Sequence, residues 1–465
     1  MTSELAAPVH TPLPSSRRAR MTGAASGIAT LLWLLLGAHR AYDLDDSITV
    51  GLFVATDSIG DAFTKAYVLN NHPLLSFLEH AVYSVTGSRS ELTMRMLPIC
   101  AAAAAVGLLA NLVADCRGAL AGAASAAVLA TNPMFADVGS QVRGYSIVVL
   151  CAIATTAILL RALRTGRATA LMLAGYGAIG AIGVATHLYM LVVLGIHAII
   201  SLVDPRVTRR WLVSWLGAVA FGAAAYVRLW RPMRDTADSL GRNFRPVFPR
   251  DLGVALLGGT VIAAALTAPL VVPVLWQARH SRVVRLGALG VILAAVGIWL
   301  VAPFDLYPRF FLWLVPLPAV AVGVAVARRP FALALVAAIV IVQVVTVWPR
   351  LTEDPFASHT VAAVFTRVRA KGGLPCTIDD FGTLRLLGYR RDFGVAASRE
   401  QMRHCTVAVL LAPAPASGPA RNADAVFRYR GALPARAKGV LWSVVPIGCW
   451  FSDHPSSATC RVPTP

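Results

Sequence analysis

Stretches of about 20 apolar residues recur along this chain and constrain its fold more than any other feature. Each is long enough to cross a hydrocarbon core of about 30 Å as a helix. The chain is 57% hydrophobic and 14% charged, whereas a soluble globular protein carries about 25% charged residues. The sequence therefore predicts a mainly α-helical, polytopic membrane protein with about eleven transmembrane helices. We expect them at about 22–39, 94–113, 119–135, 145–163, 168–186, 188–203, 211–229, 252–276, 286–301, between Arg309 and Arg328, and 331–348.

The arginines predict how these helices are oriented. The short loops that fall on one side of the membrane are rich in arginine, which is typical of cytoplasmic loops. This orientation places the N-terminus in the cytoplasm and the segments 42–93, 230–251 and 349–465 outside. The net charge of +19 follows this one-sided pattern, so we expect no nucleic-acid partner. The loop arginines are Arg117, Arg161, Arg164, Arg167, Arg206, Arg209, Arg210, Arg279, Arg282, Arg285, Arg328 and Arg329.

Composition divides the chain into three parts. Residues 1–21 are rich in Pro, Ser and Arg and are predicted to be a disordered cytoplasmic N-terminus. Residues 22–348 form the predicted transmembrane domain, and 349–465 a C-terminal extracytoplasmic domain. The first apolar run lacks a small-residue cleavage site, so we interpret it as a retained helix rather than a signal peptide. The abundance of alanine and arginine is typical of a GC-rich bacterial genome, and we expect the inner membrane of a bacterium.

The C-terminal segment is predicted to be a small α/β domain. Residues 406–411 and 440–445 are short apolar runs typical of strands, and 360–371 has helical periodicity. Four cysteines in an extracytoplasmic domain indicate two disulfides with three possible pairings, although buried free thiols are the alternative. No pair has the CxxC spacing of a metal site. The four are Cys376, Cys405, Cys449 and Cys460, whereas Cys100, Cys116 and Cys151 are interpreted as packing residues.

Three carboxylates follow the first apolar run within four residues: Asp43, Asp45 and Asp46. Acids this close to lipid are costly, because they lose hydration and repel one another. One interpretation is a solvated helix end. The other is a general base that faces a membrane-borne substrate.

Further motifs follow this acidic stretch in a characteristic order. They are Asn70-Asn-His-Pro-Leu-Leu-Ser-Phe-Leu-Glu-His80, Thr86-Gly-Ser-Arg-Ser-Glu-Leu-Thr-Met-Arg-Met-Leu-Pro98, Gln141-Val-Arg-Gly-Tyr145, Thr186-His-Leu-Tyr189 and Tyr307-Pro-Arg-Phe310. The order is similar to that of GT-C membrane glycosyltransferases of the protein O-mannosyltransferase and aminoarabinose-transferase type. Those enzymes have an acidic pair in the first external loop, a His-Pro-Pro-like segment, an Arg-x-Tyr turn and a late Arg-Tyr or Arg-Phe. The resemblance covers about residues 31–348.

The chain departs from this family pattern at three places. The acidic pair is Asp45-Asp46 rather than Asp-Glu, Leu74 replaces the second proline, and Gly144 replaces the proline of Arg-Pro-Tyr. An Asp-Asp pair also resembles that of actinobacterial arabinosyltransferases that use a decaprenyl-phosphate donor. These substitutions leave the identity of the sugar and acceptor open, with mannose and arabinose as the expected sugars.

The resemblance implies an inverting transfer of one sugar from a polyprenyl-phosphate donor to a hydroxyl of a cell-envelope glycan, glycolipid or protein. Such a reaction needs a carboxylate that takes the proton of the acceptor and cations that stabilise the departing phosphate. Asp45 matches the family's catalytic aspartate, and Asp46 is the second candidate. The alternative role for either is to cap the following helix.

Arg309 matches the family's arginine that binds the lipid phosphate, and its planar guanidinium suits two phosphate oxygens. The alternative is an arginine that extends to the membrane interface. Arg143 is the next candidate for the phosphate, with Tyr145 beside it, unless it forms a structural ion pair with a first-loop acid.

His72, His187 and Tyr189 are candidate substrate-binding residues on the outer side, although single histidines are more often structural. An Asp–His–Glu79 group could hold a divalent metal as in oligosaccharyl-type relatives, but the ligand spacing is loose and we expect no required metal or other cofactor. The Arg- and Pro-rich loop 230–251 resembles a gating loop at the membrane face, with a solvated surface loop as the alternative.

A transporter or flippase of lipid-linked saccharide is the competing function. A transporter places its acids in the middle of the membrane, whereas the predicted topology places these acids at one surface. The pattern favours the enzyme.

Overall fold

The computed structural model describes residues 17–64, 71–203, 205–240, 248–301, 306–329 and 331–353, and parts of the segment 362–446. In chain order the elements are α1 Arg17–Leu35, α2 Leu44–Ile48, the π-helix η1 Thr49–Val54, α3 Asp61–Thr64, α4 Pro73–Thr86, α5 Glu91–Arg117, α6 Ala119–Thr131, α7 Pro133–Gly139, α8 Tyr145–Thr165, α9 Ala170–Thr186, α10 Met190–Ser201, α11 Pro205–Ala224, α12 Trp230–Leu240, α13 Phe248–Leu256, α14 Val261–Ala278, α15 Arg282–Val301, the 3₁₀-helix η2 Pro308–Leu314, α16 Pro316–Arg328, α17 Ala332–Thr352, β1 Pro375–Thr377, β2 Gly394–Val395, β3 Val407–Ala412 and β4 Leu441–Pro446.

The helices agree with the predicted spans, since each of those spans overlaps at least one helix. By length and composition, five helices in the described part of the chain can cross a membrane, or up to seven if each bent pair is one span. The count of about eleven spans stays a prediction.

Three predicted spans are broken in the structure. The span between Arg309 and Arg328 divides into η2 and α16, which meet at 45°. The span at 119–135 divides into α6 and α7, which meet at 65°. The break lies at Asn132, whose side chain accepts hydrogen bonds from the N–H groups of Met134 (3.0 Å) and Phe135 (3.2 Å), with Pro133 at the first helical position. The span at 252–276 divides into α13 and α14 because Gly258 and Gly259 have φ values of 136° and 81°. Only glycine adopts such a backbone readily.

The predicted loop at 230–251 is also more regular than expected. It contains α12 and the first residues of α13, with residues 241–247 outside the described part. Its role as a gating loop stays a prediction.

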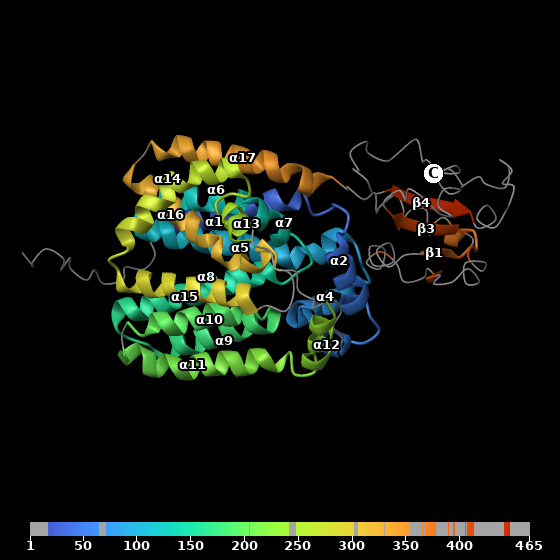
Figure 1. Cartoon of the computed structure of the whole chain (residues 1–465), viewed down its shortest axis with the longest axis horizontal. Coiled ribbons are helices and arrows are strands. Elements are labelled where there is room, and N and C mark those ends of the chain that lie inside the picture. Colours follow the sequence, from blue (N-terminus) through green and yellow to red (C-terminus); the bar gives the residue numbers. More distant parts are fainter. Residues whose placement is uncertain are drawn as a thin grey trace, which may run out of the picture. The chain divides into compact units, whose positions relative to one another are not determined.

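The chain divides into two compact units, and residues 1–36, 97–227 and 237–350 form the first. Figure 1 shows α8, α9, α10 and α11 side by side, and these helices contact one another. A buried histidine of α10 connects that helix to α8 and α9: the ring nitrogens of His197 are hydrogen-bonded to the hydroxyls of Thr156 (2.9 Å) and Tyr176 (3.1 Å). Such fully satisfied polar groups fix the relative position of helices in lipid.

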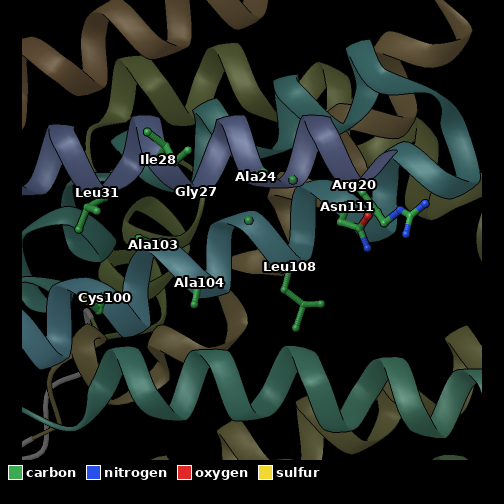
Figure 2. A pocket seen from close by; sticks show the side chains of 12 residues that line it. Arg20, Ala24, Gly27, Ile28, Leu31, Cys100, Ala103, Ala104, Leu108 and Asn111 are labelled. Carbon is green, nitrogen blue, oxygen red and sulfur yellow. The ribbon is translucent and has the colours of Figure 1, made fainter. Parts of the chain in front are cut away.

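α1 and α5 approach closely through small residues. A Cβ atom added to Gly23 would lie 2.8 Å from the carbonyl oxygen of Gly107, and one added to Gly107 would lie 2.9 Å from that of Gly23. A mostly apolar groove of about 610 Å³ runs along this contact and includes Gly27 and Asn111. Figure 2 shows the side chains that line it. None of its lining residues is a predicted site residue, so we interpret it as a helix-packing surface.

The second unit comprises residues 37–96, 228–236 and 351–465. Here α3 and α4 pack against η1, and the Nδ1 atom of His80 lies 2.7 Å from the carbonyl oxygen of Val54. The predicted strands at 406–411 and 440–445 correspond to β3 and β4. They pair antiparallel in a sheet of order β2-β1-β3-β4, where β1 is parallel to β2 and β3.

A disulfide joins Cys376 to Cys405. This is one of the pairs that the cysteine pattern allowed. Cys449 and Cys460 lie outside the described residues. The proposed boundary of a separate domain at 349 stays a prediction, as does its extracytoplasmic location, although a disulfide is typical of that environment.

Candidate active site

The predicted carboxylates lie on a short turn that we call the acid turn (residues 40–47). Asp43 has an extended backbone just ahead of α2, and its side chain accepts a hydrogen bond from the N–H of Asp46 at 2.7 Å. This geometry is that of a helix N-cap. Asp43 therefore has the capping role that the sequence allowed for Asp45 or Asp46.

Asp46 is fully buried and forms an ion pair with Arg95, which is also fully buried, at 2.7 Å. Burial and then the nearby Asp43 carboxylate raise the pKa of Asp46, whereas Arg95 opposes the shift, and the net result is a pKa of about 6. Asp46 therefore has a structural role, as the ion-pair partner of Arg95.

Arg95 also holds the backbone of the preceding residues. Its guanidinium donates to the carbonyl oxygens of Ala38 (3.3 Å), Arg40 and Ala41 (3.1 Å). Its Cζ atom lies 5.4 Å from the ring centroid of Tyr42. One side chain of α5 therefore fixes both ends of the acid turn.

Asp45 differs from Asp46 in its surroundings. It lies in the first turn of α2 and is half-buried, whereas the next residue is fully buried. A general base has to reach both the proton of the acceptor and the solvent that exchanges with it. Of the two predicted acids, Asp45 has the better access.

His72 directly precedes α4, and Glu79 lies near the middle of that helix. His72 is buried at the N-cap position, next to Asn71, whose side chain is hydrogen-bonded to the carbonyl oxygen of Ala62 (2.8 Å) and the hydroxyl of Ser76 (2.9 Å). Burial raises the pKa of Glu79 well above its usual value. Among the described residues no three His, Cys, Asp or Glu side chains gather in a group that could hold a metal ion.

A second group of predicted residues converges in the other unit. We call it the Arg–aromatic cluster; it is assembled from the turn before α8, the turn between α9 and α10, and η2. Its members are Arg143, Tyr145, His187, Tyr189, Arg309 and Phe310.

Ring contacts connect these three segments in a row. The ring of His187 lies 5.0 Å from that of Tyr145 and 4.9 Å from that of Tyr189, measured between centroids. Tyr189 stacks on Phe310 at 5.3 Å with an interplanar angle of 21°. The N–H of Tyr189 also donates to Nδ1 of His187 at 3.2 Å, which fixes the turn.

The two arginines lie at the two ends of this row. The Cζ atom of Arg143 is 5.4 Å from the ring centroid of Tyr145, and that of Arg309 is 5.8 Å from Phe310 and 5.0 Å from Tyr307. Arg143 is only 4% exposed, and Arg309 is half-buried. A guanidinium that packs against an aromatic face is held in place by a cation–π interaction.

Both arginines act on His187. Burial, followed by the charges of Arg143 and Arg309, lowers the pKa of His187 to about 3. The imidazole is therefore neutral at physiological pH and can donate or accept a hydrogen bond. The cluster combines two permanent cations with a row of aromatic faces, which suits an anion attached to a sugar ring.

The structure thus brings together five predicted site residues, Arg143, Tyr145, His187, Tyr189 and Arg309. The acid turn and His72 belong to the other compact unit.

Sequence reasoning missed three structural contributions: Phe310 as a stacking partner, Tyr42 under Arg95, and Asp43 as the cap. Only the last had a local signal, an aspartate three residues ahead of the N–H that it binds. Asp305, an acid four residues ahead of Arg309 in the sequence, lies outside the described residues.

A family model described as "Dolichyl-phosphate-mannose-protein mannosyltransferase" matches residues 70–230. This interval contains four members of the Arg–aromatic cluster and His72, but neither the acid turn nor Arg309. A search of the curated proteins found no match.

The fold is similar to that of ArnT from Cupriavidus metallidurans. The structure of that protein bound to undecaprenyl phosphate has a TM-score of 0.60 and 13% identity, and the match covers 84% of this chain and 92% of that chain. Its apo structure gives a TM-score of 0.57 and 13% identity over 83% and 92% of the two chains. The predicted class, a mainly α-helical polytopic membrane protein, is confirmed.

Proposed function

We propose that the chain is a membrane glycosyltransferase of the GT-C superfamily and that it transfers one sugar from a polyprenyl-phosphate donor to an acceptor hydroxyl. The observation that carries the proposal is the convergence of Arg143 and Arg309 on the aromatic row around His187. A phosphate needs such cations, and a sugar ring packs on aromatic faces.

In this proposal the two guanidinium groups bind the phosphate of the donor. They hold it in the ground state and neutralise the charge that develops as the bond between C1 of the sugar and the phosphate oxygen breaks. Tyr145, His187 and Tyr189 bind the sugar, and the neutral imidazole supplies a directional hydrogen bond.

Asp45 is the proposed general base. The acceptor oxygen attacks C1, its proton passes to the Asp45 carboxylate, and the electron pair of the broken bond leaves with the polyprenyl phosphate. One glycosidic bond forms as one phosphoester bond breaks, and the configuration at C1 inverts. His72 is proposed to contact the substrate from α4.

We propose mannose or arabinose as the sugar and a cell-envelope glycan, glycolipid or protein as the acceptor. ArnT has been crystallised with undecaprenyl phosphate, which supports a carrier of this class. The proposed location is the bacterial inner membrane, with the N-terminus in the cytoplasm and the C-terminal part outside.

Binding of undecaprenyl phosphate to the purified full-length protein in nanodiscs tests the proposal without knowledge of the acceptor. We expect the lipid to raise the melting temperature of the wild-type protein, and Arg143→Ala and Arg309→Ala to weaken this effect. Arg282→Ala is the matched control, because Arg282 is exposed and is predicted to lie in a cytoplasmic loop. Equal stabilisation of all four proteins would contradict the proposed phosphate site.

A further inference from the structure

The acid turn is contacted by a residue from the far end of the sequence. The N–H of Tyr42, just before Asp43, donates a hydrogen bond to the hydroxyl oxygen of Tyr389 at 2.8 Å. The two rings also pack with their centroids 5.2 Å apart. Tyr42 is almost fully buried, and both tyrosines belong to the same compact unit.

Tyr389 lies within a segment that a disulfide closes. Cys376 and Cys405 are 29 residues apart in sequence, and Tyr389 lies between them. Cys376 is part of β1, which pairs with both β2 and β3. The disulfide therefore ties both ends of the segment that carries Tyr389 to the same sheet region.

We propose that this disulfide-closed segment positions the acid turn through Tyr389, so that the C-terminal part of the chain contributes to the rate of sugar transfer. The link to rate rests on the proposed function of Asp45, whereas the contact does not. Tyr389 is a positioning residue, because it acts on the acid turn through the main chain and the ring of Tyr42.

Two anchors then hold the acid turn. Arg95 binds the carbonyl oxygens on the N-terminal side and the carboxylate of Asp46, and Tyr389 binds the one N–H at Tyr42 between them. Loss of the second anchor leaves the ion pair intact but lets the turn open more often. Asp45, in the first turn of α2, then spends less time in its productive position.

Hydrogen exchange on the full-length protein in detergent tests the contact without any substrate. Tyr389→Phe keeps the ring and removes the acceptor oxygen, so exchange in the peptide that covers residues 40–47 should be faster by about 5-fold. The double variant Cys376→Ser/Cys405→Ser should produce the same change.

Tyr176→Phe is the matched control, because it removes a buried hydroxyl that is hydrogen-bonded to His197 in the other unit. It should leave exchange at 40–47 unchanged.

Kinetics with a polyprenyl-phosphate-linked sugar test the consequence for catalysis. Tyr389→Phe should lower kcat on the order of 10-fold and leave the KM of the donor unchanged, since the phosphate site is untouched. Protonation of Asp46 weakens its ion pair with Arg95 and so contributes to the acid limb of the pH–rate profile. This contribution should move to lower pH as water reaches Asp46, because burial raises the pKa of Asp46 in the wild-type protein. A merely destabilised protein would lose active molecules without such a shift.

The outcomes separate the two claims. If the wild-type protein transfers no sugar but exchange responds as expected, the proposed function fails and the positioning contact stands. If the wild-type protein is active and Tyr389→Phe equals it in both exchange and kcat, the inference is overturned.

Discussion

The acid turn and the Arg–aromatic cluster are built in different ways. The acid turn is one contiguous stretch of eight residues, held by the side chains of Arg95 and Tyr389. The Arg–aromatic cluster is assembled from two turns and the 3₁₀-helix η2, with Arg143 and Arg309 far apart in sequence. A contiguous site has most of its geometry in local backbone, whereas the assembled one depends on the packing of α8, α9, α10 and η2. We therefore expect single substitutions in the acid turn to change either the transfer rate or the stability of the protein, but not both. Single substitutions in the Arg–aromatic cluster should affect donor binding.

The largest effect on activity is expected from Asp45→Asn. This variant keeps the size of the side chain but cannot accept a proton, so the transfer rate should fall by about 10²–10⁴-fold while donor binding is retained. Asp43→Asn is the control, because asparagine caps a helix as well as aspartate does. Wild-type rates for Asp45→Asn would transfer the role of the base to Asp46 or Asp43.

The largest effect on stability is expected from Arg95→Met. It leaves Asp46 buried without its ion pair and frees three backbone carbonyls, which should cost about 3–5 kcal/mol of unfolding free energy. Denaturation in mixed micelles measures this quantity. In the double variant Arg95→Met/Asp46→Leu much of the loss should return, because no buried charge remains. A double variant as unstable as Arg95→Met alone would show that the carbonyl contacts dominate.

In the Arg–aromatic cluster, Arg309→Ala should raise the KM of the donor and lower kcat together, because the phosphate is bound in both the ground state and the transition state. Loss of a hydrogen bond to a charged group corresponds to about 1.5–3 kcal/mol. Arg309→Lys keeps the charge but not the planar pair of donors and should be intermediate. A stable Arg309→Ala protein with normal donor affinity would leave Arg143 as the remaining candidate.

The smallest effect is a dependence of stability on pH. The pKa of Asp46 is raised to about 6 in the folded protein from an ordinary value of 3.8. Its contribution to stability is therefore fully present below about pH 4 and is lost as the pH rises through about 6. Melting temperatures between pH 4 and pH 8 should show this decrease, and Asp46→Asn should abolish it while reducing activity less than Asp45→Asn does. An identical pH dependence in the variant would exclude Asp46 as the source.

The sequence alone predicts more of the arrangement of some site residues than of others, and the acid turn and the Arg–aromatic cluster differ in this respect. The acid turn could be located from three aspartates next to an apolar run, but the separate roles of Asp43, Asp45 and Asp46 depend on burial and on Arg95, 49 residues beyond Asp46. The arginines, tyrosines and histidine of the second cluster could be named from motifs. Their convergence could not, because it depends on how distant turns pack in three dimensions.

The helices were largely predictable from hydropathy, since a long apolar run has few alternatives in a membrane. Hydropathy does not indicate where a helix breaks within such a run. The division of α6 from α7 at Asn132-Pro133 and of α13 from α14 at Gly258-Gly259 had local signals in the Asn-Pro and Gly-Gly pairs. These signals lie inside apolar stretches, where the capping side chain and the left-handed backbone decide the conformation.

A structure of the protein with undecaprenyl phosphate bound tests the central claim most directly. We predict that the lipid phosphate lies between the guanidinium groups of Arg143 and Arg309, beside His187, with the Asp45 carboxylate facing the position of the sugar's C1 atom. A phosphate bound elsewhere, for example along the groove between α1 and α5, with Arg143 and Arg309 unchanged, would contradict it.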